Sequence, residues 1–132
     1  RLNGRTYGAM DEVHDSDRVK LGATEVWEFQ NDASMGGMGG MGGMMQMAHP
    51  MHVHNVSFRV LSRTRSGEQS ALHQHLSAGF TDFGLKDVVL VLPGERVQVL
   101  MKFENHAGLY LYHCHILEHE DLGMMRNYLI ET

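Results

Sequence analysis

The only cysteine of this chain is surrounded by side chains that bind transition metals. Cys114 lies between His113 and His115, and His119 and Met124 follow it along the chain. Imidazole is the commonest protein metal ligand near neutral pH, and the sulfur atoms of cysteine and methionine suit copper. The segment therefore predicts a metal-binding function. With one cysteine, the chain cannot form an internal disulfide.

Alternation along an extended segment decides which of these side chains can share an ion. Successive residues of a strand point to opposite faces. Cys114 is therefore expected to point into the core with Tyr110 and Tyr112, whereas His113 and His115 point away from it. A single metal cannot easily use all three ligands, so the pattern predicts two metal sites on the order of 10 Å apart. The backbone between the sites would give an electron a short covalent route.

The ligands of the two sites follow from this alternation. Cys114, His119 and Met124 come from a loop that folds back on itself, and His49 is the best candidate for a second imidazole. Two histidines and a cysteine with a weak axial methionine form the blue-copper arrangement. The second site collects the imidazoles that share the other face, which are His52, His54, His113 and His115.

Other interpretations of these residues are weaker. Zinc could take Cys114 and three imidazoles, but it would leave Met124 without a role. His115 and His119 have the spacing of a helical zinc pair. A catalytic cysteine–histidine nucleophile is a further alternative, but a buried thiol among four imidazoles would bind metal first. The other histidines are predicted to lie in solvent without a role: His14, His73, His75 and His106.

Short strands separated by turns must position these ligands. Strands are predicted over residues 24–30, 56–61, 86–92, 95–103, 109–114 and 125–131. No long amphipathic helix is predicted, and residues 116–121 form at most one short turn. Many short strands with glycine and proline turns favour an all-β sandwich or barrel, mostly antiparallel.

A tract rich in methionine and glycine interrupts this pattern at about residues 35–47. Glycine at this density does not hold a fixed conformation, so the tract is predicted to be a flexible insertion between two strands. A plain linker is one interpretation, but such linkers use serine rather than methionine. We favour a transient Cu(I)-binding tract, because flexible thioethers can converge on a soft ion. Its candidate ligands are Met35, Met38, Met41, Met44, Met45 and Met47.

Size and charge narrow the class of protein. The 132 residues suit a single domain, 1–132. The formal net charge is −5 and the charged residues are scattered, so no basic patch could neutralise nucleic-acid phosphates. No apolar run approaches the roughly 18 residues of a membrane helix. We therefore expect neither a nucleic acid nor a membrane as partner.

Two motifs resemble those of a known family. HPMHVH at 49–54 and HCHILEHEDLGMM at 113–125 resemble the two C-terminal copper motifs of multicopper oxidases, the family of laccases, ascorbate oxidase and bacterial cuprous oxidases. The resemblance implies the third, C-terminal cupredoxin domain, a Greek-key β-sandwich or barrel. It also implies ligand roles: His49, Cys114, His119 and Met124 for type 1 copper, His52 for type 2, and His54, His113 and His115 for type 3.

The resemblance further implies an activity. In the family, type 1 copper takes electrons from a reducing substrate such as a phenol or Cu(I). Cys114 would pass them through His113 and His115 to a trinuclear copper centre that reduces dioxygen to water. Glu120 stands where some bacterial relatives have a carboxylate that relays protons. Asn55 replaces the glycine that usually follows the first motif.

The family's trinuclear centre needs eight histidines, and this chain offers four in register. The other four are expected from an N-terminal cupredoxin domain or from another chain, for which a homo-oligomer is one arrangement. The isolated chain is thus predicted not to be catalytic by itself. Two alternatives are a stand-alone blue-copper electron carrier and a Cu(I) storage module. The resemblance implies a periplasmic or secreted protein.

Overall fold

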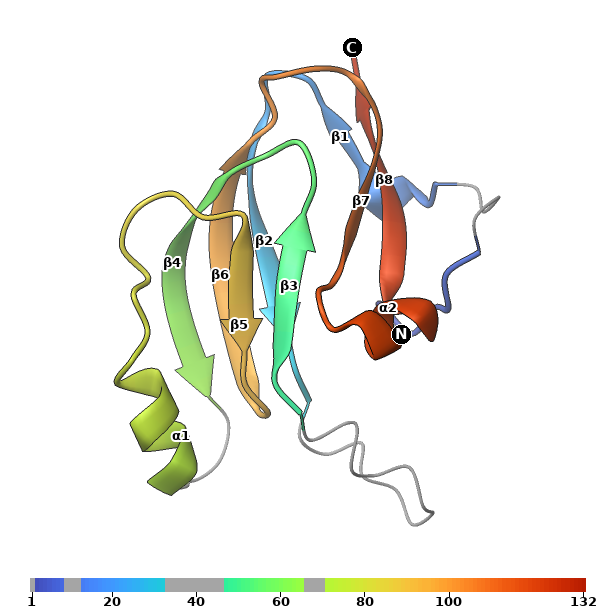
Figure 1. Ribbon diagram of the computed structural model, residues 1–132. Coiled ribbons are helices and arrows are strands. Elements are labelled where there is room, and N and C mark those ends of the chain that lie inside the picture. Colours follow the sequence, from blue (N-terminus) through green and yellow to red (C-terminus); the bar gives the residue numbers. More distant parts are fainter. Residues whose placement is uncertain (1, 9–12, 33–46, 66–70) are drawn as a thin grey trace.

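The computed structural model describes residues 2–8, 13–32, 47–65 and 71–132 (Figure 1). Strands dominate this part of the chain. The elements in chain order are η1 (Asp15–Asp17), β1 (Arg18–Lys20), β2 (Thr24–Gln30), β3 (His49–Val53), β4 (Phe58–Arg65), α1 (Ala71–Ser77), β5 (Val88–Val91), β6 (Glu95–Lys102), β7 (Gly108–Cys114), α2 (Leu117–Asp121) and β8 (Met125–Glu131).

The strands form two sheets that pack face to face (Figure 1). One sheet has the order β1-β8-β7-β3-β5 and the other the order β2-β6-β4. Neighbouring strands are antiparallel except for β1 and β8, which are parallel. The apolar face of β6, predicted from its alternation, lies in the core between the sheets: Val97, Val99 and Met101 are 0–1% exposed. The predicted all-β, mostly antiparallel sandwich is confirmed.

Most predicted strands are present with small shifts in their ends. Residues 24–30 and 125–131 form strands with those bounds, and 95–103 and 109–114 shift by a single residue at one end. The strand predicted at 86–92 is shorter, Val88–Val91, and the one predicted at 56–61 runs from Phe58 to Arg65. None of the helices in the described ranges has the length and apolar character needed to cross a membrane.

Sequence analysis missed β3, the strand that carries the first histidine motif. Pro50 argues against a strand because it has no N–H to donate to a ladder. In the structure Pro50 stands at the start of β3, where pairing with β7 has not begun. Its carbonyl accepts a hydrogen bond from the His115 N–H at 2.7 Å. The missing donor therefore costs no ladder bond to β7.

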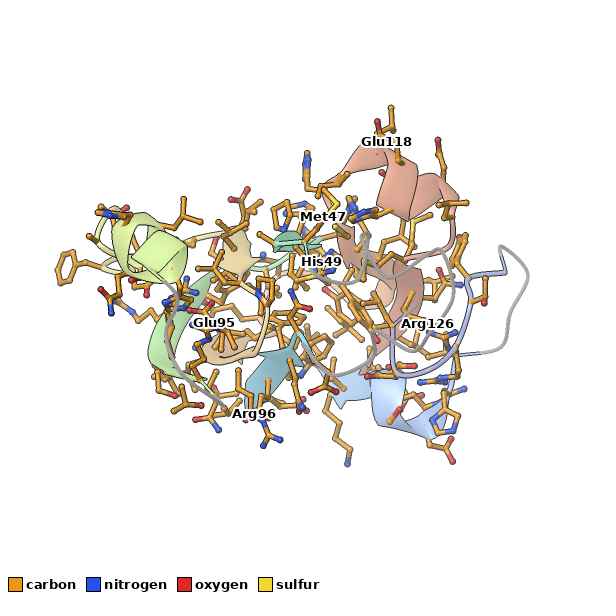
Figure 2. All side chains as sticks on the ribbon, turned by 90° about the horizontal axis from the view of Figure 1, so that it is seen from below. Met47, His49, Glu95, Arg96, Glu118 and Arg126 are labelled. Atoms are coloured by element: carbon orange, nitrogen blue, oxygen red, sulfur yellow. The ribbon has the colours of Figure 1, made fainter. Side chains whose placement is uncertain are left out.

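Predicting His73 as a solvated histidine was wrong. His73 lies on α1, is 7% exposed, and places Nε2 2.9 Å from Oε1 of the buried Glu95. Arg63 of β4 contacts the other oxygen of Glu95 at 3.2 Å and forms two hydrogen bonds to Asp82. Glu95 points into the fold where its neighbour Arg96 points away from it (Figure 2). The other three histidines of that prediction, His14, His75 and His106, are exposed as expected.

Candidate metal centres

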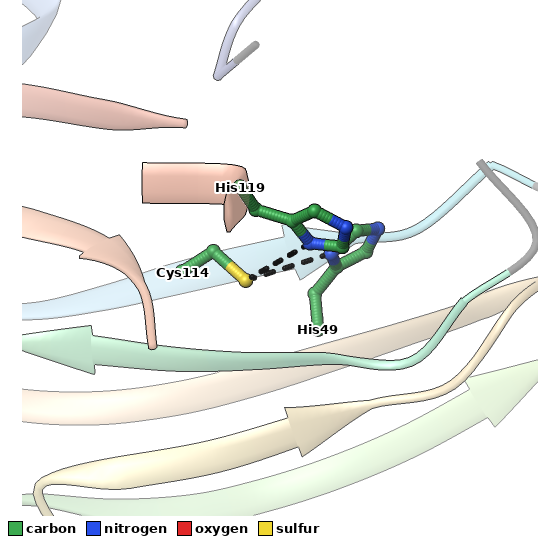
Figure 3. A group of neighbouring side chains, drawn as sticks. All are labelled: His49, Cys114 and His119. Carbon is green, nitrogen blue, oxygen red and sulfur yellow. Dashed lines mark hydrogen bonds between the residues drawn. The ribbon is translucent and has the colours of Figure 1, made fainter. Parts of the chain in front are cut away.

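The first group of donors lies in the core side of the β3–β7 pair (Figure 3). His49 begins β3, Cys114 ends β7, and His119 is on α2. The Cys114 Sγ lies 3.6 Å from Nδ1 of His49 and 3.6 Å from Nδ1 of His119. All three side chains are buried: Cys114 is 0% exposed, His49 8% and His119 7%. Their donor atoms converge from three elements on one point.

The spacing of these donors fits a single transition-metal ion. Metal–sulfur bonds of about 2.3 Å and metal–nitrogen bonds of about 2.0 Å, at trigonal to tetrahedral angles, separate the donors by about 3.5–3.7 Å. The observed separations of 3.6 Å fall in this interval. A thiolate with two imidazoles is the donor set that copper takes in electron-transfer sites. The residues present therefore fit a copper ion.

Backbone hydrogen bonds close the loop between Cys114 and Met124. The Cys114 N–H donates to the Met124 carbonyl at 3.0 Å, and the Met124 N–H donates to the His119 carbonyl at 2.9 Å. The His119 N–H in turn donates to the Ile116 carbonyl at 3.0 Å, in the first turn of α2. The fold-back expected from sequence is present. Met124 thus stands beside both other loop residues, with its side chain packed against the core.

Gly123 holds this loop against the N-terminal segment. Its φ is +88°, a value that favours glycine. A Cβ at this position would lie 2.7 Å from Thr6 Cγ2 and 3.1 Å from the Tyr7 nitrogen. The Gly123 carbonyl also accepts the Tyr7 N–H at 3.3 Å. Sequence analysis did not single out Gly123, although a glycine directly before a proposed ligand was a usable signal.

Burial sets the protonation of the first group. It lowers the pKa of His49 from 6.5 to about 4, helped by the neighbouring charge of His119. Burial also raises the pKa of the Cys114 thiol. Near neutral pH the His49 ring is therefore neutral with a free lone pair, whereas the thiol keeps its proton. An ion that binds Cys114 must displace that proton, so metal binding at this group releases it.

The second group of donors lies on the opposite side of β7. Ring nitrogens of His52, His54 and His113 all lie within 4.8 Å of one another. The Nε2 atoms of His54 and His113 are 3.2 Å apart. The His52 ring centroid lies 4.9 Å from His54 and 5.4 Å from His113. Imidazole nitrogens this close together bring several lone pairs to one place, which suits a bound cation.

Two backbone carbonyls orient the rings of this group. The Nδ1 of His52 donates to the Asp87 carbonyl at 2.7 Å, and the Nδ1 of His113 donates to the Cys114 carbonyl at 3.0 Å. In each ring this leaves the lone pair on Nε2 as the one able to bind a metal ion. Burial and the neighbouring histidines also lower the pKa of His54. Asp87 was not predicted, because any residue type offers the carbonyl that it contributes.

His115 and Glu120 lie at the edge of the second group. The His115 ring stacks on His113 at 5.6 Å and lies 5.7 Å from His52, but it is exposed. It precedes α2 and faces the second group, so the alternative of a helical zinc pair with His119 is wrong. A carboxylate oxygen of Glu120 lies 3.9 Å from Nδ1 of His113, beyond hydrogen-bond distance.

The methionine-rich tract lies mostly outside the described residues. This applies to Met35, Met38, Met41, Met44 and Met45. Met47 is described and is 42% exposed, and its carbonyl accepts a hydrogen bond from the buried Asn31 at 2.8 Å. Met47 and His49 lie at the end of the molecule that carries α2, from which Glu118 points outward (Figure 2).

Comparisons with known proteins match almost the whole of this chain. The sequence pattern of the multicopper oxidases matches residues 3–132. A laccase from Haloferax volcanii is 41% identical over 132 residues, which cover 99% of this chain and 19% of that protein. This chain thus spans about a fifth of the length of this relative.

Solved structures agree with this result. A multicopper oxidase from Campylobacter jejuni, known as a metallo-oxidase, superposes with a TM-score of 0.71 at 32% identity. The match covers 98% of this chain and 22% of that one. A laccase-like multicopper oxidase from Ochrobactrum sp., with oxidase activity towards lignin model compounds, gives a TM-score of 0.63 at 29% identity over 96% of this chain and 23% of its own. The predicted cupredoxin-like fold is therefore confirmed, and the chain belongs to the multicopper oxidase family, whose cofactor is copper.

Proposed function

We propose that this chain is the copper-binding domain of a laccase-like multicopper oxidase that takes electrons from a phenol or Cu(I) and passes them towards dioxygen. One observation carries the proposal. The Cys114 thiol lies beside two buried imidazoles on one side of β7. Its neighbour His113 lies beside a second set of imidazoles on the other side. A single strand therefore connects an electron-accepting site to an oxygen-reducing one.

The two groups supply the ligands that the family needs. His49, Cys114, His119 and Met124 would hold type 1 copper, His52 type 2 copper, and His54, His113 and His115 type 3 copper. Copper, when bound, supplies a one-electron change of oxidation state. The covalent backbone from Cys114 to His113 links the two groups directly. Glu120, 3.9 Å from His113, would hold and release protons on the side of the molecule where oxygen is reduced.

The substrates follow from the relatives and from the first group's surroundings. The Campylobacter jejuni protein is a metallo-oxidase, and the Ochrobactrum protein acts on lignin model compounds. Met47 precedes His49 of the first group by two residues and is 42% exposed, so its thioether is able to contact Cu(I) from solvent. The methionine-rich tract before it would collect that ion. A phenol would deliver its electron to the same group.

Another unit must complete the oxygen-reducing site. The relatives are about five times longer than this chain, so an N-terminal cupredoxin domain or another chain, including a second copy, would supply the missing imidazoles. We place the protein in the periplasm or outside the cell. A stand-alone electron carrier would need the first group alone and would leave His52, His54 and His113 without a role.

Oxygen uptake tests the proposal. The copper-loaded protein, with the unit that completes the second group, should consume oxygen in the presence of a phenol or of Cu(I). His113→Ala should abolish uptake while leaving reduction of the first group by substrate intact. His75→Ala, at an exposed histidine of α1, is the matched control and should leave uptake unchanged. Substrate reduction of the first group without any oxygen uptake in the assembled protein would favour the stand-alone carrier instead.

A further inference from the structure

A cluster of oxidisable rings lies beside the two donor groups and takes no part in the function proposed above. The centroid of Trp27 on β2 lies 5.4 Å from Tyr112 and 5.6 Å from Tyr128. Tyr128 lies 5.8 Å from Tyr110. Indole and phenol are the most readily oxidised rings among protein side chains. At these separations an electron passes between neighbouring rings by a single short step.

The cluster lies close to both donor groups. Tyr112 precedes Cys114 by two residues and points to the same face of β7, so their Cβ atoms are about 7 Å apart. Tyr112 is also bonded through the backbone to His113. The Tyr128 hydroxyl donates to the His54 carbonyl at 2.5 Å. An oxidised centre at either group can therefore be reduced by a ring of this cluster in a single electron transfer.

Two rings of the cluster each donate a hydrogen bond to a carboxylate that can accept the proton. The Tyr112 hydroxyl donates to Oδ1 of the buried Asp17 at 3.1 Å. The Trp27 Nε1–H donates to Oε2 of Glu25 at 2.9 Å. An oxidised phenol or indole is a far stronger acid than the neutral ring, so losing an electron becomes easier when a base already accepts the hydrogen bond. Asp17 also pairs with Arg5 at 3.0 Å and with the buried Arg126 at 3.6 Å, and these contacts hold its carboxylate beside the Tyr112 hydroxyl.

We propose that Tyr112 and Trp27 form a redox chain that carries an oxidising equivalent away from the donor groups to the Glu25 edge of β2. The inference rests on the proposed function, because the oxidant is a copper centre that has reacted with dioxygen while no reducing substrate is present. Without an exit, such an oxidant would attack its own ligands. This redox chain protects the ligands and operates when substrate is scarce.

Each step balances in electrons and protons. Tyr112 gives one electron to the oxidised centre, its O–H bond breaks, and Asp17 takes the proton. Trp27 then gives one electron to the Tyr112 radical, which recovers its proton from Asp17. The indole N–H bond breaks and Glu25 takes that proton. Finally, a small-molecule thiol in solution donates a hydrogen atom to the Trp27 nitrogen and leaves as a thiyl radical, and Glu25 releases its proton to water.

Freeze-quench electron paramagnetic resonance tests this chain. The reduced, copper-loaded oxidase is mixed with dioxygen in the absence of substrate, and a neutral indolyl radical is expected, with its hyperfine pattern altered by ring-deuterated tryptophan. The radical should be lost in Trp27→Phe and in Tyr112→Phe. Glu25→Gln should replace it with a short-lived protonated radical. Glu28→Gln, an exposed carboxylate on the same strand, is the matched control and should leave the signal unchanged.

A second readout follows the damage. After turnover without substrate, peptide mass spectrometry should find more oxidation around Cys114 in Trp27→Phe than in the native protein. Copper that is reoxidised by dioxygen without a radical at Trp27, or a radical that survives Tyr112→Phe, would overturn the inference alone. Copper that dioxygen does not reoxidise would overturn the proposed function, and with it the oxidant on which this inference depends.

Discussion

The donors of the first group stand in place through protein contacts alone. His49 and His119 direct Nδ1 at the Cys114 sulfur from two different elements, and the loop hydrogen bonds bring Met124 beside them. A site whose ligands are held by the fold changes little between oxidation states, which favours rapid electron transfer. Residue types alone indicated this set, because a thiol, two imidazoles and a thioether suit copper.

At Met124, the proposed axial contact can be removed while the other three ligands of the first group stay in place. Met124→Leu should keep the copper but raise its reduction potential, because a weak donor to the oxidised ion is lost. A redox titration followed by visible absorption measures the change. Met125→Leu, the neighbouring methionine on β8, is the control and should leave the potential unchanged. A lower potential in Met124→Leu would contradict an axial role for this residue.

The buried ring of His49 makes the stability of the metal-free protein depend on pH. Its pKa falls from 6.5 in the unfolded chain to about 4 in the fold, so between these values the unfolded state binds more protons. The stabilisation is complete above pH 6.5 and is lost as pH falls towards 4, on the order of 3 kcal/mol in total. Urea unfolding at several pH values should show a smaller loss in His49→Gln. An equal loss in the variant would contradict the assignment.

Other residues of the sites were beyond the reach of sequence. The Asp87 carbonyl orients His52, yet any residue at that position offers the same atom. His73 looked like a surface histidine because its partner Glu95 comes from a strand more than 20 residues away. Such contacts depend on the packing of elements that a local pattern does not contain.

At the scale of elements, alternation along β7 separates the two groups. Its pattern was visible in the sequence because Tyr112 and Cys114 alternate with His113, and the observed strand keeps that register. The β3 strand was not visible, since Pro50 has low strand propensity. Pairing with β5 and β7 from both sides overrides that propensity. Sequence therefore predicted the ligands of β3 without predicting the strand that holds them.

The loop that carries His119 and Met124 depends on a glycine. Gly123→Ala should destabilise the fold by about 2–4 kcal/mol, because a positive φ adds to a contact with Thr6 that has no room. It should also weaken copper binding. Gly22→Ala has a similar φ of +86° but meets nothing within 4 Å, so it should cost only about 1 kcal/mol. Equal losses of unfolding free energy in the two variants would contradict this role.

Helix α1 is joined to the sheets by buried charges. Arg63 binds Asp82 and Glu95, and Glu95 binds His73 of α1. Arg63→Met should lower the free energy of unfolding by about 2–4 kcal/mol, because Glu95 would lose its cationic partner in the core. Arg59→Met removes an exposed charge from the same strand and should change it by less than about 0.5 kcal/mol. Urea titration of the two variants measures the difference.

At the scale of the whole molecule, the sandwich places the two groups of donors on either side of one strand, β7. The all-β class and the two copper motifs were predictable from sequence, because strand alternation and ligand chemistry are local properties. The contacts that the missing unit makes were not predictable, since they depend on residues outside this chain. The chain matches about a fifth of the length of its laccase relative from Haloferax volcanii.

Visible absorption combined with copper analysis shows whether the Cys114 thiolate binds copper. We expect one copper bound at the first group and an intense blue band from the native protein, because a thiolate bonded to oxidised copper produces that colour. Cys114→Ser should lose the band, whereas His75→Ala should keep it. A native protein that binds copper at this group without colour, or a band that survives in Cys114→Ser, would contradict the assignment of Cys114 as the ligand through which electrons enter.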